Sequence, residues 1–241
     1  LVRDLIPIEH KWTTEQYQIF FWAFGKYLGI AGAQDKAGSL LGSVTNAGDD
    51  IVRPYRQNVD IKYHCDGADI VGLLCVHPSK SGGASRIISS TSVYNKLLQS
   101  PGGQSYVHRL YDRVLLYTRK TFGPNEYVAL YPLRLDSTGI LRTYWNQDYY
   151  RKSYRKDDGE LTRHGAEDPG VVRAIDAYDQ LLTDDITLRD TRHTYDSQQS
   201  QQSQTQSEPV EPSGPSGPSE QSEHELGLDM VLKQGDIQLV S

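Results

Sequence analysis

The chain has 241 residues, of which 37% are hydrophobic and 23% are charged, and its formal net charge at pH 7 is -6. This length and apolar content allow one large domain or two small ones with a real core. A modest negative charge without clustered Lys and Arg argues against a nucleic-acid-binding protein.

Two further features exclude whole classes of protein. Cys65 and Cys75 are too few for a disulfide scaffold. No apolar run reaches the length of a membrane span, and no signal-peptide pattern opens the sequence, which begins at Leu1. We therefore expect a cytoplasmic protein that does not act at a membrane.

The first predicted element is a helix from Thr13 to Leu28. Thr13-Thr14-Glu15-Gln16 has the pattern of a helix start, and Gly29 is a typical helix stop. Apolar residues recur at helical spacing between these two signals, so the helix should face a core. They are Tyr17, Phe20, Phe21, Phe24 and Leu28.

Short strands and one short helix are predicted next. The continuous apolar run from Ile70 to Val76 has the length of a buried strand. Residues 92–98 fit a short helix that ends before Pro101-Gly102-Gly103. The other predicted strands are 51–54, 59–63 and 86–90, and residues 78–83 are predicted to form a loop.

A hairpin and a second long helix are predicted in the middle of the chain. Residues 127–135 and 139–145 read as two strands joined by the turn Asp136-Ser137-Thr138-Gly139. Residues 171–182 place apolar side chains on one helical face, which predicts a helix. These side chains belong to Val172, Ile175, Tyr178, Leu181 and Leu182.

The composition changes abruptly at Ser197. From there to Glu225, Ser, Gln, Glu and Pro dominate, and Val210 is the only aliphatic residue. Such a segment buries too little apolar surface to offset its ordering entropy, so we predict a disordered insertion. The alternation at residues 236–240 is typical of a strand. The predicted organisation is one domain over 1–196, an insertion over 197–225, and a returning strand of the same domain over 226–241.

The triplet His64-Cys65-Asp66 carries the most informative chemistry. On a strand, residues i and i+2 point to the same face, so His64 and Asp66 can reach one metal ion. A neutral imidazole and a carboxylate on one face are two of the three ligands of the facial triad that holds non-heme Fe(II). Because chance also produces such triplets, a surface His and Asp at a strand end is the alternative.

Several segments near this triplet follow one another in a recognisable order. They are Asp49-Asp50-Ile51-Val52-Arg53-Pro54, His64-Cys65-Asp66-Gly67, the apolar run to Cys75, Ser81-Gly82-Gly83-Ala84-Ser85, and the segment from Ser89 to Tyr94. This series resembles the taurine-dioxygenase-like (TauD/TfdA) family, especially a branch common in filamentous fungi. The resemblance is strongest over residues 48–98 and covers nearly the whole chain outside the polar tract at 197–225.

The resemblance implies a fold and an activity. The fold is a double-stranded β-helix, a jelly-roll core with flanking helices, which agrees with the α+β class and the jelly-roll barrel that the element pattern favours. The activity is an Fe(II)-dependent dioxygenase reaction, in which a small organic substrate is oxidised by O2 while the cosubstrate 2-oxoglutarate is decarboxylated to succinate.

The resemblance also assigns residues. His64 and Asp66 match the family's first two iron ligands, and Ser85 matches the hydroxyl residue that contacts the 2-oxoglutarate carboxylate. The glycine pair Gly82-Gly83 lets the backbone come close to that anion while a hydroxyl donates to it.

The family pattern departs from this sequence at its end. The distal His and the Arg that pairs with the far carboxylate of 2-oxoglutarate are expected beyond Ser241, so the jelly roll is expected to be incomplete at the C-terminus. Neither His164 nor His193 has the matching context, and His224 lies in the polar tract. The second hypothesis is therefore a catalytically silent fragment or pseudoenzyme that at most binds a ligand, and we expect the 241-residue chain itself to be inactive. The sequence leaves the substrate and the oligomeric state open.

Two alternatives concern other residues. A zinc site built from Cys65, Cys75, His64 and His77 lacks the close paired spacing of structural zinc sites, and Cys75 within an apolar run is typical of a small buried hydrophobe. The basic stretch over residues 151–156 is interleaved with tyrosine and followed by two aspartates, which favours a solvated surface.

The segment Tyr144-Trp145-Asn146 and the pair Tyr149-Tyr150 are unusually aromatic. The family resemblance places them near the mouth of the pocket, where some would contact substrate. The alternative is that these rings pack on the exterior of the barrel.

Overall fold

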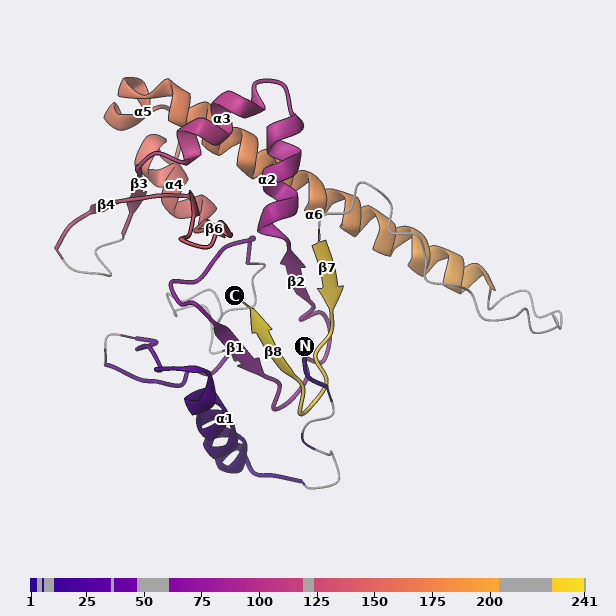
Figure 1. Ribbon diagram of the computed structural model, residues 1–241. Helices are drawn as coiled ribbons and strands as arrows, with labels where there is room; N and C mark the ends of the chain where they lie inside the picture. The colour runs from indigo at the N-terminus through magenta and orange to yellow at the C-terminus, as the bar shows by residue number, and fades with distance from the viewer. Residues whose placement is uncertain are drawn as a thin grey trace. The chain divides into compact units, whose positions relative to one another are not determined.

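The structure is a computed structural model that describes residues 1–3, 6, 11–35, 37–46, 61–118, 124–203 and 227–240, with only the backbone described for 187–203. Six helices and eight strands lie within these residues (Figure 1). The strands pair two by two, as β1 with β8, β2 with β7, β3 with β4, and β5 with β6. The chain is therefore a mixture of helices and small sheets, as the α+β prediction expects.

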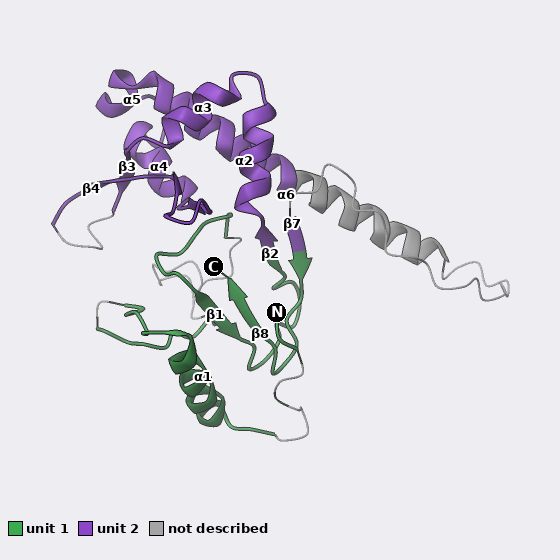
Figure 2. Cartoon of the chain, viewed as in Figure 1, with its two compact units in different colours: residues 1–86, 229–241 green, residues 87–228 purple. Residues whose placement is uncertain are grey.

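The chain divides into two compact units (Figure 2). Unit 1 combines Leu1–Arg86 with Asp229–Ser241, and unit 2 is Ile87–Leu228. The boundary between them falls within strands β2 (Ser85–Ile88) and β7 (Gly227–Met230), which pair with each other. Unit 1 is thus assembled from both ends of the sequence, and unit 2 is the continuous segment between them.

Helix α1 (Thr14–Leu28) of unit 1 begins where the sequence predicts it. The Thr13 hydroxyl accepts a hydrogen bond from the Gln16 N–H, and the Gln16 side chain accepts one from the Thr13 N–H, which completes a capping box. Tyr17 is buried, whereas Phe24 is half-buried and Leu28 is exposed. The helix is confirmed, but the face predicted to meet a core is only partly covered.

Strands β1 (Val71–Leu74) and β8 (Ile237–Val240) form an antiparallel pair in unit 1. A β-carbon at Gly72 would lie 3.0 Å from the Phe21 ring, so glycine at this position lets α1 pack closely on β1. Ile237 is fully buried, whereas β1 is mostly half-buried. The strand predicted at 236–240 is confirmed, and the buried strand predicted at 70–76 is shorter and less buried than expected.

The strand predictions upstream of β1 have different outcomes. Residues 51–54 lie outside the described residues, and so do 59 and 60. Residues 61–63 are described and do not form a strand, so that prediction is wrong where it can be compared. The strand predicted at 86–90 is found as β2, which begins one residue earlier and ends two residues earlier, because Ser89 caps the next helix.

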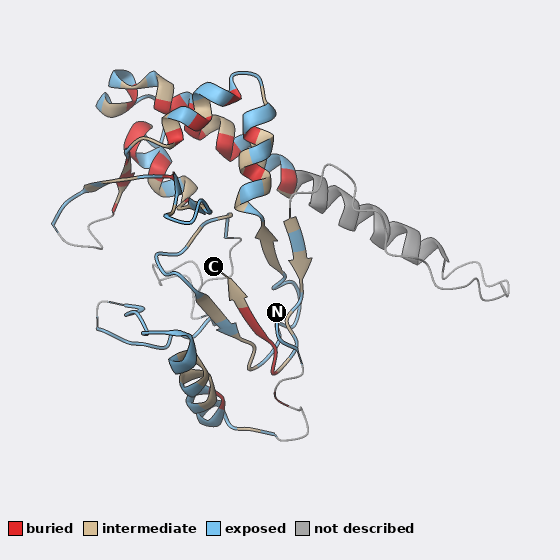
Figure 3. Ribbon diagram, viewed as in Figure 1, coloured by how far each residue is buried: buried red, intermediate tan, exposed pale blue. Residues whose placement is uncertain are grey.

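Unit 2 contains five of the six described helices. The helices predicted at 92–98 and 171–182 are confirmed, within α2 and α6, whereas the other three are not predicted by the sequence patterns. The bounds are α2 (Ser90–Gln99), α3 (Gly103–Leu110), α4 (Gln147–Tyr154), α5 (Arg163–Glu167) and α6 (Pro169–Ser203). Their buried faces meet in the core of the unit (Figure 3). Fully buried members include Val93, Leu97, Leu110, Ala174 and Ile175.

Four strands complete unit 2. They are β3 (Val114–Tyr117), β4 (Tyr127–Leu130), β5 (Leu133–Leu135) and β6 (Leu141–Thr143). The hairpin predicted around Asp136 is confirmed as β5–β6, and the Asp136 side chain accepts hydrogen bonds from the N–H groups of Thr138 and Ile140. The single strand predicted over 127–135 is instead two, because the chain breaks at Pro132 and β4 pairs with β3.

An aromatic cluster occupies the centre of unit 2. The Trp145 ring lies 4.1 Å from Tyr178 and 5.0 Å from Tyr150, measured between centroids, and all three side chains are buried. The indole N–H of Trp145 donates to Oδ1 of the buried Asp179 at 3.1 Å. Trp145 and Tyr150 therefore pack in a core, neither at a pocket mouth nor on an exterior surface, which corrects both expectations for them.

The basic stretch after the aromatic residues lies on the surface, as predicted. Lys156 is exposed and pairs with Glu160 at 2.7 Å, and Arg155 pairs with Asp176 on α6. Arg155 and Lys156 therefore form ordinary surface ion pairs.

Residues 197–203, which begin the tract predicted to be disordered, continue α6 as helix. Residues 204–225 lie outside the described residues, so the disordered insertion stays a prediction there. None of the described helices combines the length and the apolar content that crossing a bilayer requires.

Candidate metal centre

The side chains of His64 and Asp66 face one another in unit 1. Nε2 of His64 lies 3.6 Å from Oδ1 of Asp66. Only an isolated bridge is found at His64, so the regular strand expected around the triplet is not formed there. The predicted juxtaposition is nevertheless present. The two side chains are 36% and 55% exposed, which leaves them accessible to a ligand from solvent.

A backbone carbonyl fixes the orientation of the His64 ring. Nδ1 of His64 lies 2.8 Å from the carbonyl oxygen of Lys62. A carbonyl oxygen only accepts, so Nδ1 carries the proton and, in the neutral ring, the lone pair lies on Nε2 facing Asp66. Metal-binding histidines commonly donate their other ring N–H in this way. Sequence patterns contain no signal for this contact, because the acceptor is a backbone group.

The two side chains shift one another's pKa in a consistent direction. The hydrogen bond to Asp66 raises the pKa of His64, although burial opposes the rise. The same interaction lowers the pKa of the Asp66 carboxyl. The pair therefore favours a positive charge between the carboxylate and the ring, which either a proton on Nε2 or a metal cation supplies.

The geometry fits a divalent cation. Bonds from nitrogen and oxygen ligands to such metals are about 2.0–2.2 Å long, so one ion can bridge two atoms that are 3.6 Å apart. An imidazole and a carboxylate are also the donor types of non-heme iron sites. Across the described part of the chain, no group of three His, Cys, Asp or Glu side chains is arranged to hold a metal.

The other histidines considered as ligands have separate surroundings or are not described. His164, in unit 2, packs its ring edge on Tyr127 at 5.3 Å and lies 3.9 Å from Glu167. The side chain of His193 is not described, and His224 lies outside the described residues.

The alternative zinc site gains no support. The Cys75 thiol donates to the carbonyl oxygen of Leu232 at 3.7 Å, and burial raises its pKa. A raised pKa disfavours the thiolate that a metal requires. Cys65 and Cys75 are both free thiols.

The glycine pair before Ser85 lies in the predicted loop and adopts a backbone conformation that favours glycine. Gly82 and Gly83 have φ of 65° and 70°, in the left-handed region that favours glycine. The Ser79 hydroxyl donates to the Gly82 carbonyl at 2.8 Å, and a β-carbon at Gly83 would lie 2.4 Å from that hydroxyl oxygen. Ser85 follows at the start of β2 and is half-buried. Its contact with 2-oxoglutarate stays a prediction, and the segment 49–54 lies outside the described residues.

Comparisons with known proteins agree with the sequence pattern. The chain matches the family described as "Taurine catabolism dioxygenase TauD, TfdA family" over residues 1–211. It is also similar to FR-33289 synthase of Streptomyces rubellomurinus (strain ATCC 31215), with 33% identity over 92 residues. That alignment covers 36% of this chain and 27% of the synthase.

Proposed function

The chain belongs to the taurine catabolism dioxygenase family, TauD and TfdA, and from this premise we propose that it binds Fe(II) and 2-oxoglutarate for the oxidation of a small organic substrate by O2. The observation that carries the proposal is the contact of His64 and Asp66 at 3.6 Å, with the His64 ring oriented by Lys62. We also propose that the small antiparallel sheets belong to the jelly-roll core that the family implies.

Each residue of the proposed site has a separate task. Nε2 of His64 and Oδ1 of Asp66 would hold the ion, while the Lys62 carbonyl keeps the imidazole in the tautomer that can bind. The Ser85 hydroxyl would donate to a carboxylate of 2-oxoglutarate at the turn formed by Gly82 and Gly83. Bound Fe(II) supplies the redox chemistry that couples decarboxylation of 2-oxoglutarate to oxidation of the substrate.

The substrate is proposed to be a small organic molecule. The similar protein is named FR-33289 synthase, and this name supports a small-molecule substrate here as well. The net charge of -6 gives no support to a nucleic-acid partner. These statements about substrate and partner remain proposals, since the alignment covers only 27% of the synthase.

Replacing His64 with alanine is expected to weaken Fe(II) binding at least tenfold, or ~1.4 kcal/mol. The substitution removes one of two ligands and leaves the Asp66 carboxylate as the remaining donor of the pair. The measurement is an anaerobic Fe(II) titration of wild type, His64→Ala and the control His77→Ala, which removes another exposed histidine of unit 1. Unchanged affinity in His64→Ala would place the iron elsewhere.

The 241-residue chain is expected to bind iron without turning over. Two protein ligands define the geometry of the ion poorly, and the described residues provide no cluster of three. Succinate release should be measured with Fe(II), ascorbate, O2 and 2-oxoglutarate, and it should not exceed the level of His64→Ala. Iron-dependent succinate release that is lost in His64→Ala would reject the hypothesis of a catalytically silent fragment. It would establish the chain as an active dioxygenase.

A further inference from the structure

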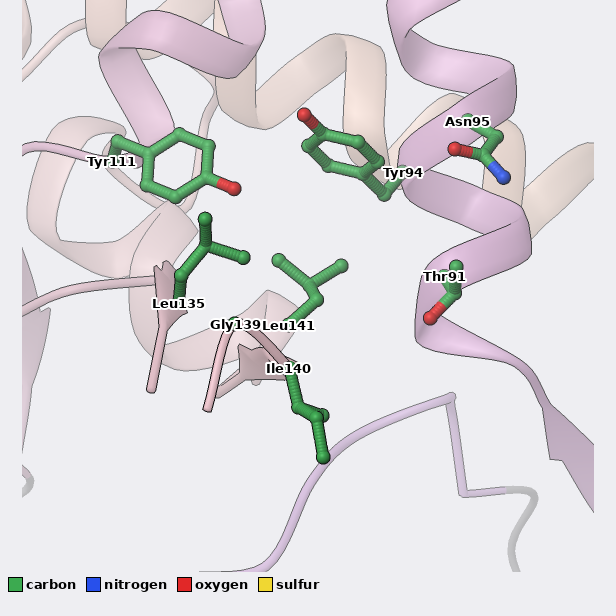
Figure 4. Close-up of a pocket in the computed structure, with 8 residues that line it drawn as sticks. All are labelled: Thr91, Tyr94, Asn95, Tyr111, Leu135, Gly139, Ile140 and Leu141. Atoms are coloured by element: carbon green, nitrogen blue, oxygen red, sulfur yellow. The ribbon is translucent and has the colours of Figure 1, made fainter. Parts of the chain in front are cut away.

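A pocket of about 360 Å³ lies in unit 2 between helix α2 and the β5–β6 hairpin (Figure 4). Its volume falls in the range of small-molecule sites, roughly 300–1,000 Å³. None of the residues assigned above to iron or to 2-oxoglutarate lines it, and all of its lining residues belong to unit 2. It is therefore a feature separate from the His64–Asp66 pair.

One wall of the pocket is a polar face of α2. Thr91, Tyr94 and Asn95 stand three and four residues apart, so they share one side of the helix. The opposite side carries Val93 and Leu97, which are fully buried in the core. Because Val93 and Leu97 pack in the core, the residues on the pocket side of the helix are available for a ligand.

Two tyrosines line the pocket side by side, Tyr94 on α2 and Tyr111 at the C-terminal end of α3. The rings of Tyr94 and Tyr111 meet edge to face with centroids 6.4 Å apart. The Tyr111 hydroxyl points toward Tyr94 (Figure 4), and burial together with their hydrogen bond raises the pKa of Tyr111. The Tyr111 hydroxyl therefore stays protonated at physiological pH, and both residues present hydroxyl groups beside aromatic edges.

The opposite wall is apolar and built on a firm turn. Leu135 and Leu141 are paired across β5 and β6, and both side chains line the pocket. The Asp136 side chain holds the turn between them through hydrogen bonds from Thr138, Ile140 and Arg142. Leu135 is 59% exposed although it is a large apolar residue. A ligand that covers this wall would therefore remove apolar surface from water, which favours binding.

The lining combines hydroxyl, amide and aliphatic groups, and none of its members is acidic or basic. An ionised ligand would lose hydration there without a compensating charge. We propose that this pocket binds a small uncharged organic molecule, with its apolar edge on Leu135 and Leu141 and a hydroxyl or carbonyl group at Tyr94 and Tyr111. The proposal does not depend on iron binding.

The test uses three probes that share a methyl-substituted ring. They are p-cresol, which is uncharged, 4-methylbenzoate, an anion, and 4-methylbenzylamine, a cation. Titrations of the iron-free chain followed by NMR should give p-cresol a Kd on the order of 1 mM. The two charged probes should bind at least about fivefold more weakly. Equal binding of all three, or no saturable binding of p-cresol, would overturn the proposal.

Variants locate the binding. Leu135→Trp fills the pocket from an exposed position and should weaken p-cresol binding about tenfold, whereas the control Leu161→Trp, at another partly exposed leucine of unit 2, should not. The double variant Tyr94→Phe, Tyr111→Phe should lose about fivefold, because only the hydroxyl groups are removed. Circular dichroism checks that each variant is folded.

The same titration on His64→Ala separates this site from the proposed iron site. Binding of p-cresol should be unchanged in that variant, whatever its affinity for Fe(II). If His64→Ala abolishes p-cresol binding, or if Leu135→Trp leaves it intact, the ligand does not occupy the pocket and the proposal is wrong.

Discussion

Asp179→Asn is expected to stabilise the protein above pH 7, by about 4 kcal/mol at most, and to have progressively less effect toward pH 4. Burial raises the pKa of the Asp179 carboxyl to about 7, while the hydrogen bond from Trp145 opposes part of the rise. A side-chain hydrogen bond with Gln147 also lowers this pKa. Asparagine keeps the acceptor for Trp145 and removes the charge.

The number of protons bound in the folded and unfolded states decides how stability changes with pH. Between pH 4 and pH 7 the folded state keeps the Asp179 proton, whereas the unfolded chain, with an ordinary pKa of 3.8, has lost it. The folded state therefore binds more protons, and stability falls as pH rises through this window. Above the folded pKa the contribution is constant, and the wild type carries the full cost of a buried carboxylate.

The measurement is urea unfolding of wild type and variant at several pH values from 4 to 8.5. Asp184→Asn is the matched control, since Asp184 lies on the same helix and is exposed. The gap between Asp179→Asn and wild type should widen with pH, and Asp184→Asn should show no such trend. A gap that is independent of pH would show that Asp179 is ionised in the folded state throughout.

Gly103→Ala is expected to destabilise unit 2 by about 3 kcal/mol or more. Gly103 begins α3, where a β-carbon would lie 2.0 Å from the Leu97 carbonyl oxygen and 2.7 Å from that of Leu98. Both contacts are with backbone at the end of α2, so a rotamer change cannot relieve them. The helices would have to separate, which loses packing of the buried Leu97.

Gly25→Ala provides a control with the opposite sign. Gly25 lies within α1 and has open space where a β-carbon would stand, so alanine should stabilise the helix by about 0.5–1 kcal/mol. Thermal unfolding of both variants against wild type tests the pair. Equal stability of Gly103→Ala and wild type would mean that α2 and α3 are packed less closely than the structure shows.

Elements with local signals are predictable from this sequence. The capping box of Thr13 and Gln16 defines the start of α1, and the Asp136 turn defines the β5–β6 hairpin. Helix α4 also has a local signal that was missed, because Asn146 caps it by accepting from the Tyr149 N–H. The aromatic residues beside Asn146 favoured a strand and concealed this cap.

Elements that depend on distant contacts are not predictable in the same way. The start of α3 has no side-chain cap, and Pro101-Gly102-Gly103 reads as a loop. Its glycine is required by the backbone of α2, a contact that no local pattern contains. The candidate site shows the same division. The pair His64 and Asp66 follows from the sequence, but the supporting carbonyl of Lys62 does not, since every residue has one.

The pairing of β1 with β8 has a consequence for synthesis on the ribosome. The paired residues are roughly 165 positions apart, with all of unit 2 between them. At about 5–20 residues per second, β1 waits on the order of 10–30 s before β8 has been translated. During that interval the edge of β1 that pairs with β8 stays uncovered, and the whole of unit 2 is translated before β8 emerges. Nascent β1 is therefore a natural binding site for chaperones and a point where crowded translation would promote aggregation.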